Sequence, residues 1–540
     1  MSNTLGSHGA VGRREAAFTR LFPKRLQARD PVTLKKLAQA MIGNAGDTAS
    51  NTPDGEENLA VPAGYTYLGQ FIDHDLTFDT TSSFNSPSDP SNLRTPRFDL
   101  DNIYGSGPDD QPYLYATADA NGMRRGASLV LGRAIAGSPN RHDLLRIGTS
   151  DDARAVIGDP RNDENAIVCN LQAAFIQFHN AVVTRLAQEK PTLSGKALFV
   201  TARKLVRWTY QRIVVEDYAP RIIEPATYLT FRHRLEAQGE GAFMLFKAGQ
   251  RSAIPIEFAG AAYRFGHSMV RTGYKLNAGH TPQLIFTPGQ GIDSLMGFGK
   301  LSDSHWIEWK RFFPKDNQFK AGAAGPAQNT DVALDRLQWA YRIDTALVDP
   351  LRILPDAISK GDSLADLNLR RSDLFRLVGG QTVADALGVA RLDPKYLVLR
   401  STPAGPYGYT SLADISPALM TDTPLWTYIL CEAQTGLVDA WLQKNGGATG
   451  NKPLDDDDLL LGVEGVNKQR HRAPIAQLGP VGGMILLETF YGLLLADPDS
   501  FLSITSAEDQ ALSDAWFAFV TKNGTADVSM WRLLEVAGVT

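Results

Sequence analysis

The sequence predicts a mainly α-helical protein, built as one large helical domain with few short strands. Apolar residues recur at intervals of three and four, most clearly from Asn165 to Gln188, which we expect to form one long amphipathic helix. Strand-like alternation is scarce, and no repeat of fixed period appears. Further helical patterns cover residues 198–217, 257–270, 333–340, 425–443, 481–495 and 506–523.

The chain divides unevenly into an N-terminal arm and a body. Residues 1–60 are rich in Gly, Asn, Asp and Ser and have weak periodicity, which predicts an extended arm lying over a larger unit. Residues 61–540 carry the helical patterns and form the predicted domain. A chain of 540 residues is long enough to enclose a buried cofactor within such a unit.

Composition excludes several classes of protein. The net charge of −5 provides no basic field for nucleic acid, and two cysteines are too few for a disulfide framework. Charged residues follow Arg13-Arg14 where an export signal needs an apolar stretch, so we expect no signal peptide and a cytoplasmic or non-classically secreted protein. Residues 478–496 contain Glu488 and Pro480, which favour a buried helix over a transmembrane segment. Neither composition nor motifs define an oligomeric state.

Common catalytic motifs are absent or incomplete. The chain has no His-Glu-x-x-His, no P-loop and no complete Gly-x-Gly-x-x-Gly. Residues 361–364 spell Gly-Asp-Ser-Leu, a short signature of serine esterases, but no matching Asp-x-x-His follows, and a helix N-cap at Asp362 or Ser363 is favoured. The acidic run 455–458 is typical of a solvated loop.

One histidine lies between two carboxylates, in the order Asp73-His74-Asp75, with Gln70 one helical turn earlier. On a helix, residues four apart share a face, so Gln70 and His74 can point into one cavity while the two carboxylates diverge. This segment can therefore serve several ligands at once.

Two further segments carry a histidine or an arginine in a polar setting. His267 follows Arg264 by three residues, and an arginine close to a histidine disfavours protonation of the ring, which makes it a better metal ligand. The same arginine could bind an anionic group of a cofactor whose metal the histidine ligates. Haem fits this description, because it supplies both iron and propionates. Arg161 opens a polar segment just before the long amphipathic helix.

A loop near residue 100 is rich in oxygen ligands. Thr95, Asp99 and Asp101 alternate along it, and together with Asp75 they offer three carboxylates and a hydroxyl. Loop carbonyls would complete the six to eight oxygens that Ca²⁺ takes, roughly as in other protein sites. The pattern is not that of an EF-hand.

Together these motifs resemble the animal-type haem peroxidases, and in particular bacterial members of that superfamily. The resemblance extends from about Tyr65 to Leu502. It rests on Gly-Gln-x-x-Asp-His-Asp at 69–75, Thr-x-x-x-Asp-x-Asp at 95–101, Arg-x-x-Glu at 161–164, Arg-x-Gly-His at 264–267 and Leu-Asn-x-x-Arg at 367–371.

The resemblance implies a role for each matching residue. His74 would be the distal base, with Arg161 and Gln70 beside it, and Gln70 would lie where a halide or pseudohalide binds. His267 would be the proximal iron ligand, with Asn368 accepting its other ring N–H. Two groups complete the implied sites: haem-propionate partners at Arg264 and Arg371, and calcium ligands at Asp75, Thr95, Arg97 (through its backbone carbonyl), Asp99 and Asp101.

The resemblance also implies covalent haem. Asp73 and Glu164 match positions that esterify haem methyl groups, so the cofactor would be a haem b derivative linked through both. Asn165 stands where some members form a sulfonium link through methionine, so that third bond cannot form. Asp101 replaces a serine of mammalian members, and its charge should strengthen calcium binding.

The implied activity is that of a haem peroxidase, which uses hydrogen peroxide to oxidise halide, thiocyanate or small phenols through a compound I intermediate. A fatty-acid dioxygenase or cyclooxygenase-like protein is the first alternative, but cyclooxygenases carry a tyrosine three residues before the proximal histidine, where this chain has Arg264. Tyr263 is one position off, and we expect it to face elsewhere. A haem-binding adhesion or signalling protein is the second alternative, which intact His74 and Arg161 disfavour.

Overall fold

A computed structural model of the 540-residue chain gives the fold. The structure describes residues 16–45, 55–78, 91–117, 125–138, 140–148, 153–286, 294–315, 337–355, 359, 363–400, 408–446, 452, 454 and 475–540. The acidic run 455–458 and the proline-containing loop at 85–90 (Asn-Ser-Pro-Ser-Asp-Pro) lie outside these residues.

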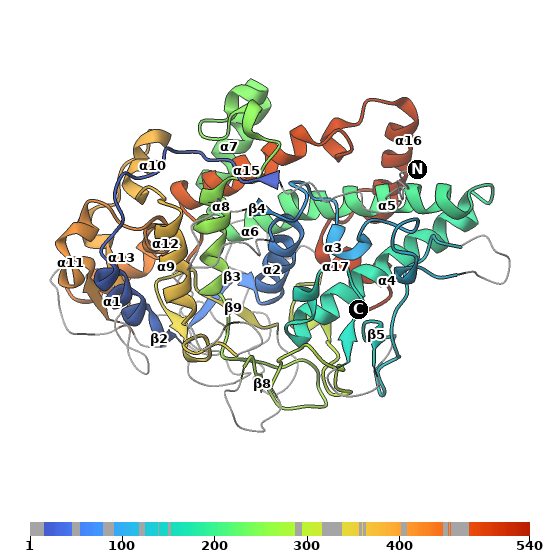
Figure 1. Ribbon diagram of the computed structural model, residues 1–540, viewed down its shortest axis with the longest axis horizontal. Coiled ribbons are helices and arrows are strands. Elements are labelled where there is room, and N and C mark those ends of the chain that lie inside the picture. The colour runs from blue at the N-terminus through green and yellow to red at the C-terminus, as the bar shows by residue number, and fades with distance from the viewer. Residues whose placement is uncertain are drawn as a thin grey trace, which may run out of the picture.

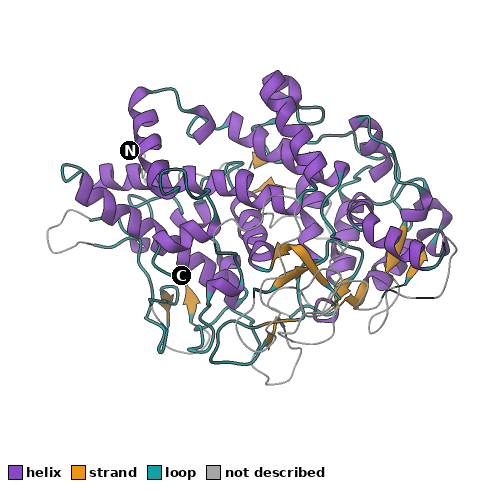
Figure 2. Cartoon of the chain, turned by 180° about the vertical axis from the view of Figure 1, so that it is seen from behind, coloured by secondary structure: helices purple, strands orange, loops and turns teal. Residues whose placement is uncertain are grey.

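Helices dominate the described chain, as the sequence predicts (Figures 1 and 2). The longer α-helices are α1 (Pro31–Met41), α2 (Gly64–Leu76), α4 (Ala166–Glu189), α5 (Gly195–Arg212), α7 (Pro225–Gln238), α9 (Leu364–Leu374), α10 (Gly380–Leu387), α12 (Leu425–Ala433), α13 (Thr435–Lys444), α15 (Pro480–Ala496), α16 (Ala507–Val520) and α17 (Met530–Val536). The short ones are α3 (Asp101–Tyr104), α6 (Ala219–Ile222), α8 (Ile256–Gly260) and α11 (Leu412–Ile415).

Strands occur only as short pairs in the described residues (Figure 2). The antiparallel pairs are β1 (Ala16–Ala17) with β4 (Ser91–Asn92), β3 (Glu57–Pro62) with β9 (Trp339–Tyr341), β5 (Arg146–Ile147) with β6 (Arg154–Ala155), β7 (Gly273–Tyr274) with β8 (Gln283–Leu284), and β11 (Val398–Arg400) with β12 (Tyr409–Ser411). One pair, β2 (Ile42–Ala45) with β10 (Leu347–Val348), is parallel.

Helix α2 lies in the middle of the molecule, with α4 and α5 on one side and α9 and α12 on the other (Figure 1). It packs against α4 through a stacked ring pair, Phe71 and Phe175, whose centroids are 4.5 Å apart. Helix α4 starts where the side chain of Asn165 accepts hydrogen bonds from the backbone N–H groups of Ile167 and Val168. Apolar burial on both flanks therefore fixes α2, and with it the Asp-His-Asp segment.

The N-terminal arm contains more regular structure than predicted. Helix α1 buries Leu34 and Leu37 and packs on α9, and its first turn is capped by Asp30. The segment before it is tied to the body, since the backbone N–H groups of Leu21 and Phe22 donate to the carboxylate of Glu257. The described part of the arm lies over the body. Its helix could have been predicted from the spacing of its apolar residues, which the prediction of an extended arm did not take into account.

Two of the predicted helices differ in the structure. The described end of segment 333–340 is extended and continues into β9, because Trp339 and Tyr341 pair with β3. Segment 257–270 breaks after Gly260 and continues as a 3₁₀ helix over Ala262–His267. That break changes how the segment presents His267, since a 3₁₀ helix has about three residues per turn.

One described helix, α4, is long and apolar enough to cross a membrane, and 89% of its apolar window is buried inside the protein. Helix α15, the segment that the sequence marked as almost long enough to span a bilayer, is also packed inside. Its Glu488 accepts hydrogen bonds from the backbone N–H groups of Met244, Leu245 and Phe246. Both are core helices of the fold.

Candidate active site

A cavity of about 500 Å³ lies beside α2. Its wall includes every residue that the sequence assigned to catalysis or to the cofactor: Gln70, Asp73, His74, Arg161, Glu164, Arg264, His267, Asn368 and Arg371. These residues come from four separate parts of the chain, which only the packing of α2, α4, α8 and α9 brings together. The cavity is therefore the candidate active site.

Close packing of α2 against its neighbours sets the position of the wall. A Cβ atom added at Gly69 would lie 2.5 Å from the hydroxyl oxygen of Tyr218, so only glycine allows the helix to approach that ring. The next residue, Gln70, and His74, one helical turn after it, both line the cavity, as their spacing predicts.

His74 is held through one ring nitrogen. Its Nδ1 lies 2.6 Å from Oδ1 of Asn162, and both side chains are buried. Burial, and then the positive charge of Arg161, lower the pKa of His74 to about 4, although Asp159 and Asp73 act in the opposite direction. The imidazole is therefore neutral at neutral pH, and its Nε2 is left for the cavity.

Arg161 is fixed by a buried carboxylate. Its Nε and Nη2 donate to Asp159, and Nη2 also donates to the backbone carbonyls of His74 and Thr77. The guanidinium lies over the ring of Phe78, with its carbon 4.5 Å from the ring centroid. Arg161 thus keeps its charge beside His74 without an ion pair to any carboxylate of the cavity wall.

The same carboxylate leads to a second arginine. Asp159 also pairs with Arg94, whose Nη1 is 2.9 Å from Asp101. The pKa of Asp159 lies well below its ordinary value, because the charges of Arg161 and Arg94 outweigh the opposing effect of burial. A buried chain of four alternating charges therefore connects Asp101 to Arg161.

Glu164 and Gln70 form another part of the wall. Nε2 of Gln70 donates to Glu164, and Oε1 of Gln70 accepts from Nδ2 of Asn165 at 3.2 Å. Burial raises the pKa of Glu164 to about 7, and Asp159 and Asp73 add to this effect against Arg161. Burial also acts on Asp73, but there the charges of Arg264 and Arg161 lower the pKa overall. The two predicted ester-forming carboxyls therefore differ in ionisation.

His267 lies on the 3₁₀ helix Ala262–His267 and is held from α9. Burial and the neighbouring Arg264 lower its pKa to about 3, so the effect of Arg264 that the sequence predicts is confirmed. Its Nδ1 lies 2.7 Å from the side-chain amide of Asn368. The pairing of these two residues across 101 positions of the chain matches the predicted partnership.

The orientation of that amide differs from the prediction. Nδ2 of Asn368, not Oδ1, faces the ring, and it would donate to an unprotonated Nδ1. A ring that binds metal through Nε2 needs its proton on Nδ1, so the amide must turn by 180° for Oδ1 to accept. No other hydrogen bond of the described residues holds the Asn368 amide, so this rotation breaks none.

The two predicted propionate partners stand at the same end of the cavity as His267. Nε of Arg264 donates to the backbone carbonyl of Ala259, and its Nη1 lies 3.8 Å from the carboxylate of Asp73. Arg371 lines the cavity from α9, one turn after Asn368. Both arginines can offer donors to an acidic group of a cofactor.

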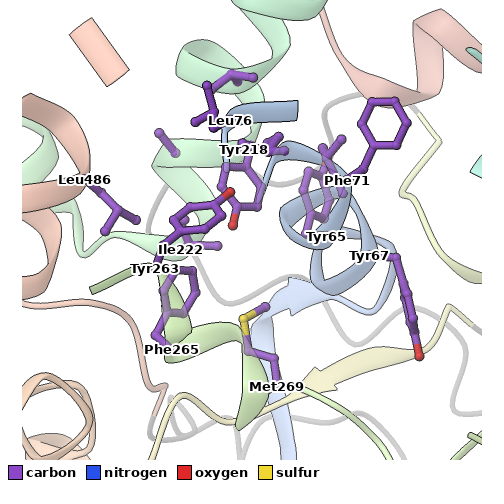
Figure 3. Close-up of a cluster of buried hydrophobic side chains, with 14 of the residues drawn as sticks. Tyr65, Tyr67, Phe71, Leu76, Tyr218, Ile222, Tyr263, Phe265, Met269 and Leu486 are labelled. Carbon is purple, nitrogen blue, oxygen red and sulfur yellow. The ribbon is translucent and has the colours of Figure 1, made fainter. Parts of the chain in front are cut away.

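Tyr263 corrects an expectation. It lines the same cavity as His267, whereas we expected it to face elsewhere. Its ring stacks on Phe258, with centroids 4.6 Å apart. It also lies near Tyr218 (Figure 3), at a centroid distance of 6.5 Å. The long side chain reaches the wall because the chain breaks at Gly260 and curls tightly, which the sequence pattern did not reveal.

The predicted calcium ligands meet on the other side of α2. Carboxylate oxygens of Asp75, Asp99 and Asp101 lie within 4.8 Å of one another. Both oxygens of Asp75 are buried without a hydrogen-bond partner, and burial together with Asp99 and Asp101 raises its pKa well above the ordinary value. Thr95 lies in the same loop and donates to Asp99 at 2.8 Å, and the backbone N–H of Arg97 donates to the carbonyl of Thr95. Three carboxylates that converge in this way fit a divalent cation.

Sequence reasoning missed three residues of this region. Asn162 and Asp159 lie in the polar segment from which only Arg161 and Glu164 were selected, and Arg94 precedes the calcium loop. Nothing in their spacing indicates their partners, since Arg94 meets Asp159 across 65 positions. His179, another buried histidine, is a packed helix residue that pairs with Tyr104 and with the carbonyl of Ala127. His471 lies outside the described residues.

Comparison with known proteins places this architecture. Residues 79–288 match the family described as animal haem peroxidase, a range that includes Arg161, Glu164 and His267. Chorion peroxidase of Drosophila melanogaster is 30% identical over 141 residues, which cover 25% of this chain and 17% of that protein. Myeloperoxidase of Mus musculus is 26% identical over 155 residues, covering 28% of this chain and 20% of that protein. The chain thus spans a small part of these relatives' length.

Solved structures share the fold over nearly the whole chain. Peroxidase A from Dictyostelium discoideum superposes with a TM-score of 0.53 at 13% identity, covering 95% of this chain and 94% of that one. A fatty acid alpha-dioxygenase from Arabidopsis thaliana gives a TM-score of 0.51 at 15% identity, covering 97% and 76%. The helical architecture is therefore common to both kinds of protein.

Proposed function

Since the chain belongs to the animal haem peroxidase family, we propose that its cavity binds haem and uses hydrogen peroxide to oxidise halide, thiocyanate or small phenols. One observation carries the proposal. A single cavity is lined by two neutral histidines, each engaged by an asparagine at Nδ1, together with an arginine whose ion-pair partner, Asp159, lies behind the cavity wall. These residues can bind a metal cofactor on one side of the cavity and a reactant on the other side.

The residues of the wall fit a haem. Nε2 of His267 would hold the iron, Arg264 and Arg371 would pair with the propionates, and a volume of about 500 Å³ suits a large planar cofactor. When bound, the haem iron supplies the redox chemistry of peroxide cleavage. Family membership itself implies haem.

His74 and Arg161 supply the proton transfer and the charge. Neutral His74 accepts a proton at Nε2 from one oxygen of the peroxide and returns it to the other oxygen. The guanidinium of Arg161 stabilises negative charge that develops as the O–O bond breaks, and Asp159 keeps it in place. The low pKa of His74, about 4, keeps this base unprotonated at neutral pH.

Two finer proposals concern the cofactors. Asp73 and Glu164 would form esters with haem methyl groups, each methyl losing a hydrogen in a two-electron oxidation by hydrogen peroxide, which is reduced to water. Asp75, Asp99 and Asp101 bind Ca²⁺ with Thr95 and the carbonyl of Arg97. Acidic acetone should then leave haem on the protein, and the doubly substituted Asp73→Asn, Glu164→Gln variant should release it. Terbium luminescence at the acidic cluster, displaced by calcium, should disappear in Asp75→Asn.

The function is tested with purified full-length protein supplied with haem. We expect a Soret band and peroxide-dependent oxidation of a phenolic dye, and His74→Ala should lower the rate about 10²–10⁴-fold, the usual contribution of a positioned base. His280→Ala, at an exposed histidine, is the matched control. A protein that stays colourless with haem, or a His74→Ala variant as active as the parent, contradicts the proposal.

The position of Tyr263 favours a second candidate, oxidation of a fatty acid. Tyr263 brings a buried hydroxyl to the cavity wall. Once an oxidised cofactor has removed the hydrogen atom of that hydroxyl, the resulting tyrosyl radical could take a hydrogen atom from such a substrate. Oxygen uptake with a polyunsaturated fatty acid and no added peroxide, abolished in Tyr263→Phe, would support it. If the parent takes up no oxygen and the Tyr263→Phe variant still oxidises the dye, only the peroxidase activity is supported.

A further inference from the structure

His74 is the first member of a buried chain of side-chain amides. Its Nδ1 is 2.6 Å from Oδ1 of Asn162, and Nδ2 of Asn162 donates to Oε1 of Gln172 at 2.8 Å. Nε2 of Gln172 then donates to the backbone carbonyl of Asn102 at 3.2 Å. Asn162 and Gln172 are fully buried, so water cannot replace these partners.

The direction of this chain is set at its far end. A backbone carbonyl can only accept, so Gln172 must turn its Nε2 towards Asn102 and its Oε1 towards Asn162. Asn162 must in turn direct Nδ2 at Gln172 and Oδ1 at His74. Reversing either amide would bring two acceptors or two donors together in a dry site, which costs about 1–3 kcal/mol for each unsatisfied group.

We propose that Asn162, oriented by Gln172, is a positioning residue that keeps the proton of His74 on Nδ1 and so leaves Nε2 as a bare acceptor towards the cavity. The catalytic meaning of this inference rests on the proposed function, because a base for peroxide needs a lone pair on the nitrogen that faces it. The position of the proton on the His74 ring depends on contacts within the polypeptide, so it can be tested without the proposed function.

The protein contains a buried histidine with the opposite arrangement. His179 is also fully buried, but its Nε2 lies 2.7 Å from the backbone carbonyl of Ala127, and its Nδ1 lies 3.0 Å from the hydroxyl of Tyr104. The carbonyl requires a proton on Nε2, so Nδ1 accepts from Tyr104. His74 and His179 should therefore show opposite tautomers in one sample.

Nitrogen NMR of the full chain labelled with ¹⁵N-histidine tests this directly. Protonated and bare ring nitrogens differ widely in chemical shift, and His74→Gln and His179→Gln assign the signals. Protein that carries haem is reduced and saturated with carbon monoxide, so that its iron is diamagnetic, whereas haem-free protein is measured as it is. A haem-free sample still reports the tautomer, so failure of the proposed function is distinguishable from failure of this inference.

We expect His74 to be protonated at Nδ1 and His179 at Nε2. Asn162→Leu, which removes the acceptor at similar size, should move the His74 proton to Nε2 and leave the His179 signals unchanged. Asn162→Asp keeps an acceptor at the same place, and as a protonated carboxyl it can donate to Oε1 of Gln172 as Nδ2 of Asn162 does, so the Nδ1 proton should be preserved. A parent protein with the proton of His74 on Nε2 overturns the inference without any variant, and so does an unchanged His74 signal in a folded Asn162→Leu.

In the loaded enzyme, the same variants separate positioning from folding. Asn162→Leu should lower kcat/KM for peroxide about 10²-fold or more, as loss of a correctly placed base does, with KM for the phenolic donor unchanged. Asn162→Asp should recover most of the loss. Equal losses in both variants would assign Asn162 a merely structural role.

Discussion

The two histidines of the cavity are anchored by the same residue type in different ways. His74 meets Oδ1 of Asn162, which is held by Gln172, whereas His267 meets Nδ2 of Asn368, which has no further hydrogen-bond partner among the described residues. The first amide cannot turn without breaking a buried chain, and the second can. One side of the cavity is therefore preset by the fold, and the other is free to adapt when a metal binds.

Surrounding charges follow the same division. The side of His74 is backed by the buried chain from Asp101 through Arg94 and Asp159 to Arg161. On the side of His267, Arg264 donates to the backbone carbonyl of Ala259, and its Nη1 lies 3.8 Å from the carboxylate of Asp73. The side of His74 is therefore held by buried contacts of the protein itself, whereas we expect a cofactor to complete the side of His267.

The largest effect should distinguish the two histidines themselves. His267→Ala removes the iron ligand, so haem binding and the Soret band should be lost, whereas His74→Ala should keep the Soret band and lose only reactivity with peroxide, about 10²–10⁴-fold. Haem titration followed by stopped-flow mixing with peroxide measures both. Equal loss of haem in the two variants would break the assignment of sides.

Removing the charge that backs the His74 side should destabilise the fold. Arg94→Leu leaves Asp101 and Asp159 buried without their shared guanidinium, which costs about 3–5 kcal/mol in comparable cases. Urea denaturation with a calcium chelator present measures the loss. Arg391→Leu, which breaks an exposed pair with Asp385, is the control and should cost only about 0–1 kcal/mol. Similar losses in the two variants would refute a special role for the buried chain.

Glu164 should make stability depend on pH. Its pKa is raised from the ordinary 4.5 to about 7, so the folded state binds the proton more tightly than the unfolded state. Its contribution is fully present below pH 4.5 and is lost as pH rises through about 7, by up to about 3 kcal/mol.

The difference in unfolding free energy between the parent and Glu164→Gln isolates this group from other buried carboxyls with raised pKa, such as Glu432. We expect that difference to change between pH 4.5 and 7 in haem-free protein. A constant difference across this range would show that folding does not raise the pKa of Glu164.

The smallest effect concerns Asn368. Asn368→Leu should weaken haem binding about 10–100-fold, the usual result of losing the partner of a ligating histidine. Asn368→Asp, which offers an acceptor without any rotation, should bind at least as tightly as the parent. Asn162→Leu should leave haem affinity unchanged, and a loss there as large as in Asn368→Leu would remove the contrast between the two asparagines.

Prediction from sequence succeeded where residues close together in the chain share one local structure. Gln70 and His74 face one cavity because they are one helical turn apart, and Asp75, Asp99 and Asp101 converge because a short loop carries two of them. Prediction failed where a local break changed the geometry, as for Tyr263 after Gly260 and for the segment that enters β9.

By itself, the sequence determined the helical class, the residues of the site and the family resemblance, since these depend on residue type and on spacing along a helix or loop. Only the tertiary structure decided which partners these residues have, as in the pairing of Arg94 with Asp159 or of His74 with Asn162 across 88 positions. The physical reason is that hydrogen bonds and ion pairs in a dry interior are selected by distance and direction in space. Those contacts hold the ring of His74 through a buried chain of two amides and the ring of His267 through a single amide.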